Sequence, residues 1–477
     1  MRKRMRKISI FLLFALMFGL LTACADNNQP AETATEETAT EETATEETAT
    51  EQPATETDAE TVEDETPPPV ATDNGDAIVV RMLTRWSGDQ PREVAFRDWI
   101  DAFNAENTHI QIDAVHISDE PTLLDRIRTS FATGDQPNLF WEYGGARTIE
   151  YVRNGMLMDL QPVLDADPEW SNMFLPLFDK WIYEDYPGLF GMPFEFYAIA
   201  LFYNEDIFAE AGLEPPRSIE EFEYVSERFL EMGIVPMPLG VRDPWRGGHL
   251  FNNLVMKTWG ADAIERLASR ELAYDSPEII NILETMQDFG ERGFFGSDPI
   301  AEDVNWEEMM FGTGQAAMLQ MGSWLLGSMA HMEIADSIGV VPFPYVNPAF
   351  RDSWFGSAAG FSVTVQNDPA ERDATIEVLK YIYSREFFEK VWEAEQGGLL
   401  PIRLEYLRNA AEVEVSPISL KFIDVVAGAA YFRDDVQTYD PLPGMLDFVR
   451  NAFQGLFVGE SPESVARSIV DEINARE

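Results

Sequence analysis

The chain has 477 residues, which carry 84 acidic and 34 basic side chains and a formal net charge of −50 at pH 7. Residues 25–76 hold 17 of the acidic side chains and residues 1–23 hold 5 of the basic ones, so residues 77–477 keep a net charge of −38. A surface this acidic argues against nucleic acid and anionic lipid as partners. Cys24 is the single cysteine, which excludes a disulfide within one chain.

The first 76 residues read as a targeting segment followed by a tether. Residues 1–23 combine five basic side chains with an apolar run, Ile8 to Leu21, which is too short for a conventional membrane span and is typical of a secretory signal peptide. The run ends in Leu21-Thr22-Ala23-Cys24, which resembles a bacterial lipobox and implies cleavage before Cys24 and lipidation of its sulfur. The alternative is a plain secretory signal with a chance cysteine. Residues 24–76 repeat Glu-Glu-Thr-Ala-Thr, and we expect them to form a disordered acidic tether.

From Ile78 onward the apolar pattern alternates between strand and helix periods. It predicts strands over Ile78–Thr84, His109–Val115 and Asn138–Trp141, with helices over Arg92–Glu106 and Pro121–Ala132 between them. Strand-helix alternation of this kind indicates an α/β fold with a parallel sheet, in which ligands bind outside the carboxyl ends of the strands.

Two loops follow the carboxyl ends of these strands and pair aromatic with polar groups. Trp86 and Ser87 lie in the first loop, and Glu142 and Tyr143 lie in the second. Both loops are expected at the same edge of the sheet, so we consider these four residues candidates for ligand contact.

The stretch from Gly191 to Leu213 predicts a buried strand that leads into a capped helix. Ala198–Tyr203 is almost entirely apolar, Asn204 is placed to cap a helix over Glu205–Ala211, and Gly212 is placed to end it. Just upstream, Glu195 and Tyr197 put a carboxylate and a ring at the mouth of the strand. A polar group beside aromatic faces suits a sugar or another polyhydroxylated ligand.

The rest of the chain also alternates between patterns that predict strands and patterns that predict helices. A strand is predicted over Phe361–Val365, a helical apolar stripe over Pro369–Ala394, and helices over Leu442–Phe457 and Ser461–Ile473. About 400 residues follow the tether, which is enough for two lobes with separate cores and a cleft between them.

Five motifs follow one another in a fixed order along the chain: Phe131–Asn138, Asn154–Leu160, Gly191–Pro193 with Phe202–Asp206, Phe311–Met318 and Gly322–Trp324. This series resembles family 1 of the extracellular solute-binding proteins, which are carbohydrate receptors of ATP-driven importers. The resemblance implies a two-lobed, periplasmic-binding-protein-like α/β fold of type II. It places three hinge crossovers, at Pro193–Tyr197, near Trp354–Gly360 and at Leu400–Leu404. Lobe 1 would comprise residues 77–195 and 356–402, and lobe 2 residues 196–355 and 403–477.

The ligand-binding residues follow from the chemistry of sugars and from this resemblance. Aromatic faces cover the C–H side of a sugar ring, while carboxylate, amide or Arg groups bind its hydroxyls. Among 11 Trp residues we single out Trp86, Trp245, Trp324 and Trp354. The full candidate set is Trp86, Ser87, Glu142, Tyr143, Glu195, Tyr197, Asp243, Trp245, Gly322, Trp324, Trp354, Gly356 and Arg403. Maltose receptors of the family have a carboxylate where this chain has Tyr197, so whether Glu195 or Tyr197 faces the ligand is open.

Two other functions compete with sugar binding. Cleft carboxylates such as Glu142, Glu195 and Asp243 could serve a glycoside-acting enzyme, but no motif of a nucleophile, zinc or nucleotide site accompanies them. The four His residues are scattered, so we expect no metal and no cofactor. A polyamine would also fit carboxylates framed by aromatic rings. The order of the motifs favours sugar.

The sequence therefore predicts an extracytoplasmic binding protein of an ABC transporter, held at the membrane by the lipid on Cys24. It would act as a monomer, bind sugar or oligosaccharide between two hinged lobes, and deliver it to the membrane permease.

Overall fold

The computed structural model describes residues 77–429, 431–442 and 444–477. The predicted signal peptide, the tether and Cys24 lie outside the described residues. The strands are β1 Ile78–Thr84, β2 Ile110–His116, β3 Leu139–Glu142, β4 Met192–Asn204, β5 Met318–Gly322, β6 Ile338–Val341, β7 Ser353–Val363 and β8 Tyr431–Arg433. The helices are α1 Pro91–Glu106, α2 Glu120–Thr133, α3 Ile149–Arg153, α4 Gln161–Asp165, α5 Pro168–Ser171, α6 Glu205–Ala211, α7 Ile219–Glu231, α8 Pro244–Trp259, α9 Asp262–Ala268, α10 Pro277–Glu291, α11 Val304–Gly312, α12 Leu326–Met329, α13 Pro369–Ile382, α14 Arg385–Ala394, α15 Pro417–Val426, α16 Met445–Gln454 and α17 Pro462–Arg476.

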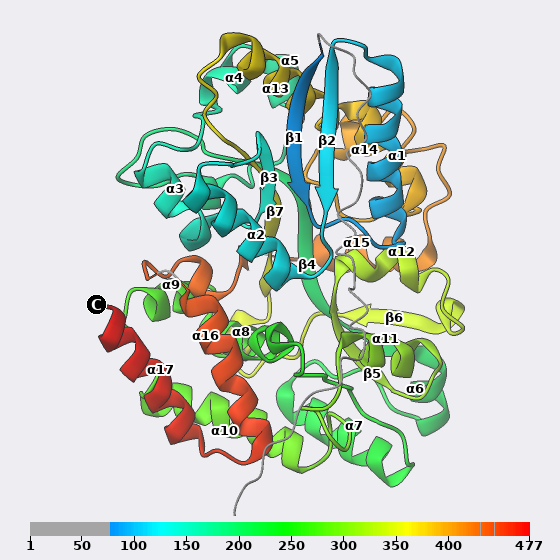
Figure 1. Ribbon diagram of the computed structural model, residues 1–477. Helices are drawn as coiled ribbons and strands as arrows, with labels where there is room; N and C mark the ends of the chain where they lie inside the picture. The colour runs from blue at the N-terminus through cyan, green and yellow to red at the C-terminus, as the bar shows by residue number, and fades with distance from the viewer. Residues whose placement is uncertain (1–76, 430, 443) are drawn as a thin grey trace, which may run out of the picture. The chain divides into compact units, whose positions relative to one another are not determined.

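Two long strands connect the halves of the sheet. The strand order is β2-β1-β3-β7-β4-β5, with β6 added to β4 and β8 added to β7. Strands β1, β2 and β3 are parallel, as predicted, whereas β7 runs antiparallel to both β3 and β4. The first part of β4 pairs with β7, and its second part, from Ile199, pairs with β5 and β6 (Figure 1). The chain thus passes from one half of the sheet to the other within single strands.

The pairing of β4 with β7 is close because β7 carries small residues. Every residue of β7 is buried, and its sequence, SWFGSAAGFSV, contains two glycines. A Cβ atom on Gly356 would lie 2.5 Å from the carbonyl oxygen of Tyr197, well inside van der Waals contact. Gly356, a predicted ligand contact, therefore has a packing function between the two strands.

Buried side chains form one large core around β1, β2 and β3 and two adjoining clusters around the second part of β4, and we call the parts of the chain around them lobe 1 and lobe 2. The lobe 1 core gathers β1, β2, β3, the start of β4 and the end of β7 with α1, α2, α13 and α14. The lobe 2 clusters begin at Ala198 and Ile199 of β4 and continue through α8, α10, α15, α16 and α17. At the third passage, Leu400, Ile402 and Leu407 pack in the lobe 1 core and Ile418 packs in lobe 2. The predicted boundaries of the lobes stay a prediction.

Local signals in the sequence place several helices well. Asn204 Oδ1 accepts hydrogen bonds from the backbone N–H groups of Asp206 (3.0 Å) and Ile207 (3.2 Å), which confirms the cap predicted for α6. Gly212 ends this helix with φ of 66°, a conformation that favours glycine. The stripe predicted over Pro369–Ala394 is two helices rather than one, because the chain breaks at Tyr383 and Ser384 caps α14. No helix of the described residues is both long and apolar enough to cross a membrane.

Candidate functional site

Four aromatic side chains gather where β4 enters lobe 2, and we call Tyr197, Trp245, His249 and Trp324 the aromatic floor. The ring centres of Tyr197 and Trp324 are 5.8 Å apart, those of Trp245 and Trp324 are 6.1 Å apart, and those of Trp245 and His249 are 4.8 Å apart. Tyr197, Trp245 and Trp324 are partly exposed, whereas the side chain of His249 is buried. The floor thus offers partly solvent-exposed ring surface at the junction of the lobes.

Local sequence explains why these rings meet. Trp245 and His249 are four residues apart on α8, so they lie on the same face of the helix. Asp243, which directly precedes α8, ties the start of this helix to the start of α11, because its Oδ2 accepts a hydrogen bond of 2.9 Å from the backbone N–H of Val304. The Trp324 ring folds back over Gly322 so closely that any Cβ on Gly322 would overlap it. The Gly-Ser-Trp sequence therefore directs the Trp324 ring by leaving room for it.

A polar cluster lies at the lobe 1 side of the junction and comprises Arg85, Glu120, Tyr143 and Arg147. The Tyr143 hydroxyl donates to Glu120 Oε2 at 2.9 Å, and both terminal nitrogens of Arg147 donate to Glu120 Oε1 at 3.0 Å. Arg85 Nη1 lies 3.4 Å from the Tyr143 hydroxyl. Burial acts to raise the pKa of Glu120, but the charges of Arg147, Arg450 and Arg85 outweigh it and lower that pKa to about 2. Glu120 is therefore a carboxylate at neutral pH.

A buried ion pair joins the two lobes beside these groups. Lys180 of the 3-10 helix Asp179–Trp181 donates from Nζ to Asp434 Oδ2 at 2.6 Å, and the exposed fractions of the two side chains are 1% and 4%. Asp434 also accepts a hydrogen bond of 3.0 Å from the Tyr197 hydroxyl. Burial acts to raise the pKa of Asp434, but Lys180 outweighs it, and the pKa lies below its usual range. The Lys180 nitrogen is 5.9 Å from the centre of the Tyr143 ring, so the pair connects the polar cluster with the aromatic floor.

Arg450 and Asp435 extend this network within lobe 2. Arg450, on α16, pairs with Asp435 through Nη2, and Asp435 also accepts from the Asn252 side chain. The charge of Arg450 contributes to the low pKa of Glu120, and Arg147 of the polar cluster lines the same cavity as Asp447 of α16. Rings, carboxylates and guanidinium groups from both lobes thus meet in one region.

Several predicted ligand residues lie elsewhere. Trp86 is 2% exposed in the lobe 1 core, with its ring centre 4.6 Å from that of Phe96. Trp354 is equally buried in lobe 2, and Arg403 is an exposed residue that donates from Nε to the Asn172 carbonyl at 3.3 Å. Ser87, in the loop after β1, is exposed. These residues do not join the aromatic floor or the polar cluster, and their part in ligand binding stays a prediction.

Two predicted carboxylates are buried with partners of their own. Glu142 accepts hydrogen bonds from Ser362 Oγ at 2.8 Å, from Trp181 Nε1 and from the backbone N–H of Gly144, and burial raises its pKa. Glu195 pairs with Arg92 at 3.0 Å and accepts from Trp141 Nε1 at 3.1 Å. The sequence leaves open whether Glu195 or Tyr197 faces the ligand. In the structure Tyr197 belongs to the aromatic floor, whereas Glu195 is paired with Arg92.

Sequence reasoning missed most of the charged groups of the site. Glu120, Arg147, Lys180, Asp434, Asp435 and Arg450 belong to no motif and come from distant parts of the chain. The sequence analysis predicts no helix over Trp245 and His249, so their four-residue spacing gives no signal until the structure places both residues on α8.

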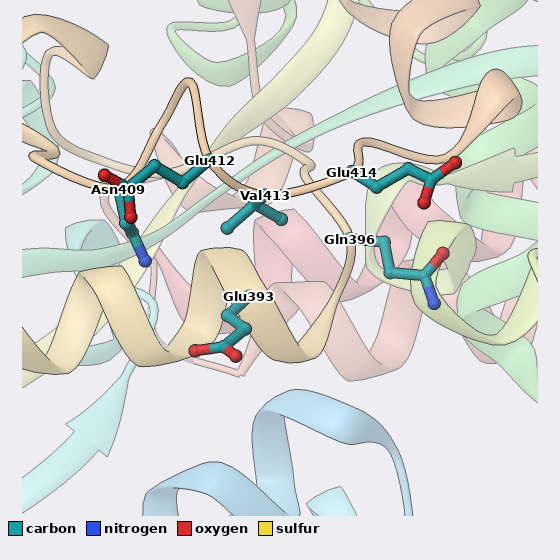
Figure 2. Close-up of a pocket in the computed structure, with 6 residues that line it drawn as sticks. All are labelled: Glu393, Gln396, Asn409, Glu412, Val413 and Glu414. Atoms are coloured by element: carbon teal, nitrogen blue, oxygen red, sulfur yellow. The ribbon is translucent and has the colours of Figure 1, made fainter.

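Two cavities lie near the surface of the described residues. One, of about 210 Å³, is lined in lobe 1 by α2, by α3 and by Arg147 of the 3-10 helix Gly145–Arg147, and in lobe 2 by α16, including Asp447. The other, of about 460 Å³, lies at the end of α14 and is lined by Glu393, Gln396, Asn409, Glu412, Val413 and Glu414 (Figure 2). The three glutamates do not converge on one point in Figure 2, and no group of carboxylates, His or Cys in the described residues is arranged to hold a metal ion.

Comparison with known proteins identifies the family. Residues 88–387, more than half of the chain, match the family described as bacterial extracellular solute-binding protein. The chain belongs to this family. An ABC transporter extracellular-binding protein of Pyrococcus horikoshii is 23% identical to this solute-binding protein over 225 residues, which span 46% of this chain and only 49% of that protein. A maltotriose-binding protein of Pyrococcus abyssi is 22% identical over 353 residues, 72% of this chain and 71% of that one.

A solved structure shows the same fold. A chitin oligosaccharide binding protein superposes on this solute-binding protein with a TM-score of 0.76 and 20% identity, over 84% of this chain and 99% of that one. The predicted α/β fold of the periplasmic-binding-protein type is thereby confirmed.

Proposed function

We propose that this chain captures a sugar or oligosaccharide between its two lobes and delivers it to the permease of an ABC importer. The observation that carries the proposal is the partly exposed aromatic floor, which the hydrogen bond from Tyr197 to Asp434 connects to the buried ion pair of Asp434 with Lys180. Ring faces bind the apolar side of a sugar, and charged groups held in fixed geometry bind its hydroxyls. The sugar-binding names of relatives such as the maltotriose-binding protein support the same class of ligand.

The carboxylates of the site disfavour the polyamine alternative. Each already has a cationic partner in the chain: Glu120 pairs with Arg147, Asp434 with Lys180, and Asp435 with Arg450. A polyamine would have to displace one of these partners, whereas neutral hydroxyl groups could add to the pairs without breaking them.

Ligand binding would be coupled to the relative position of the lobes. Tyr197 lies on β4, one of the two strands that pass between the lobes, and its hydroxyl contacts Asp434 in the interlobe ion pair. A ligand that touches the floor in lobe 2 and the polar cluster in lobe 1 binds the closed arrangement more tightly than the open one. Such a ligand would increase the fraction of molecules in the closed arrangement, to an extent set by its difference in affinity for the closed and open arrangements.

The same proposal places the protein outside the cytoplasm, as a monomer anchored through a lipid on Cys24. Replacing Cys24 with Ser in the full chain should release the protein into the medium. Retention on cells would contradict the anchor without bearing on sugar binding.

A thermal-shift screen of residues 77–477 tests the ligand class, because a ligand of the folded state raises the melting temperature. Mono- and oligosaccharides, polyamines and ferric salts form the arms of the screen. We expect stabilisation by a saccharide that is lost in Trp324→Ala and kept in Trp259→Ala, a partly buried Trp on the same lobe that lies outside the floor. Stabilisation by polyamines alone would refute the proposal.

A further inference from the structure

Arg85 is a half-buried cation without a carboxylate partner in the part of the chain that the structure describes. Its guanidinium lies 5.1 Å from the centre of the Trp141 ring, and its single hydrogen bond is the 3.4 Å contact with the Tyr143 hydroxyl. Most arginines of the described chain form an ion pair with Asp or Glu, as expected for a protein with such an excess of acid. A partly desolvated guanidinium without a paired anion is costly unless a ligand supplies one.

Arg450 also has an unused donor in this region. Its Nη2 pairs with Asp435, whereas its Nε is buried without a hydrogen-bond acceptor among the described residues. Arg85 is linked to Glu120 through the Tyr143 hydroxyl, at 3.4 Å and 2.9 Å, and Arg147 donates to Glu120 directly at 3.0 Å. The charge of Arg450 also contributes to the low pKa of Glu120.

Arg85 is the one of these three arginines that has no carboxylate within ion-pair distance among the described residues. Arg147 pairs with Glu120, and Arg450 pairs with Asp435. Two other carboxylates act on the charge of Arg85, Glu195 and Glu93, but both have other partners. Glu195 is already bound to Arg92, and the Glu93 carboxylate lies against Gly88.

We propose that the bound saccharide carries an anionic oxygen group, and that Arg85, flanked by Arg147 and Arg450, receives it. This inference rests on the proposed function and narrows it from sugars in general to acidic sugars. The anionic group is the carboxylate of a uronic acid or the phosphate of a sugar phosphate, since Arg donors fit both. The aromatic floor would hold the neutral part of the same ligand.

Isothermal titration of residues 77–477 separates these ligands. The probes are trigalacturonic acid, its methyl ester, which is neutral, neutral galacto-oligosaccharide and galactose 1-phosphate. A hydrogen bond to a charged group stabilises a complex more than one to a neutral group. We therefore expect the acid to bind at least about tenfold more tightly than its ester. This preference should weaken as salt is added. Tighter binding of the phosphate alone would also support the site and assign it to phosphate.

Substitution of Arg85 connects the preference to the proposed residue. Arg85→Gln should abolish the difference between the acid and its ester, while Arg85→Lys should keep part of it. Arg81→Gln is the matched control, because Arg81 lies on β1, the strand that Arg85 directly follows, carries the same charge and pairs with Asp135. Equal affinity for the acid and the ester, or an unchanged preference in a folded Arg85→Gln protein, would overturn the inference and leave sugar binding standing. Failure of every saccharide to bind would overturn the proposed function itself.

Discussion

The ion pair between Lys180 and Asp434 gives the sharpest test of how the lobes are held together. Lys180→Met removes the cation and leaves a carboxylate that keeps only two donors, the Tyr197 hydroxyl and the backbone N–H of Asp435. Breaking a buried pair by removing one partner costs about 3–5 kcal/mol. With an unfolding entropy of roughly 2 cal/mol/K per residue over about 400 residues, this corresponds to a decrease of about 4–6 °C in Tm.

The pH dependence of this loss identifies its cause. The pKa of Asp434 is lowered in the folded protein, so its pair stabilises the fold above the unfolded-state pKa and loses this effect as the pH falls through the folded-state pKa. The deficit of Lys180→Met should therefore be full at pH 7 and shrink as the pH falls below the unfolded-state pKa of about 4 toward the lower folded-state pKa of Asp434. Scanning calorimetry from pH 3 to pH 7 measures both quantities.

A second lysine provides the control for this experiment. Lys380 pairs with Asp167 at 2.7 Å, but both side chains are 36% exposed. Lys380→Met should cost less than about 1 kcal/mol, because water screens an exposed pair. If Lys180→Met were no more destabilising than Lys380→Met, or equally destabilising at pH 3 and pH 7, the ion pair would not be what holds the lobes.

Three further substitutions test separate parts of the structure. Glu120→Gln should lower the free energy of unfolding at pH 7, and it should reduce the loss of stability that the wild type shows between pH 5 and pH 2, because the pKa of Glu120 is held at about 2. Urea midpoints across this pH range measure both effects. An equal loss of stability in wild type and variant would show that Arg147 and its neighbours do not stabilise the carboxylate. Gly356→Ala should cost about 1–3 kcal/mol through overlap with the Tyr197 carbonyl, and a neutral result by urea unfolding would contradict the close strand pairing. Burial lowers the pKa of Lys257 to about 7, and the charge of Asp352 opposes this shift only in part. Between pH 7 and pH 10 the unfolded chain therefore binds one proton more at this lysine than the folded chain does. Wild-type stability should rise there by up to about 1.4 kcal/mol per pH unit, and Lys257→Met should remove this rise.

The sequence predicts elements well where the signal is local. The α6 helix was placed from Asn204 to Gly212 because the cap, the dipole-matched first turn and the ending glycine are all neighbours in the chain. The stretch Ile78–Thr84 was predicted residue for residue because its apolar run is bounded on both sides.

Burial by distant segments is what local patterns could not give. Trp86 follows a strand end, as a ligand-binding ring would, but Phe194 and Phe361, more than 100 residues away, cover it. Glu142 has the same placement and is enclosed by Trp181 and Ser362. Lys180 and Asp434 are 254 residues apart, so no spacing rule could pair them. Of the aromatic floor, the sequence thus predicts Tyr197, Trp245 and Trp324 as candidates, while it also selects the buried Trp86 and Trp354 and gives no sign of the charged groups.

The most direct test of sugar capture is a crystal structure of residues 77–477 with the saccharide that gives the largest thermal shift. The account predicts a sugar ring packed against Trp324 or Trp245 of the aromatic floor, with polar contacts to Glu120, Arg147 or Arg85 from lobe 1. A saccharide bound in the pocket of Figure 2, or anywhere away from the aromatic floor, would contradict it.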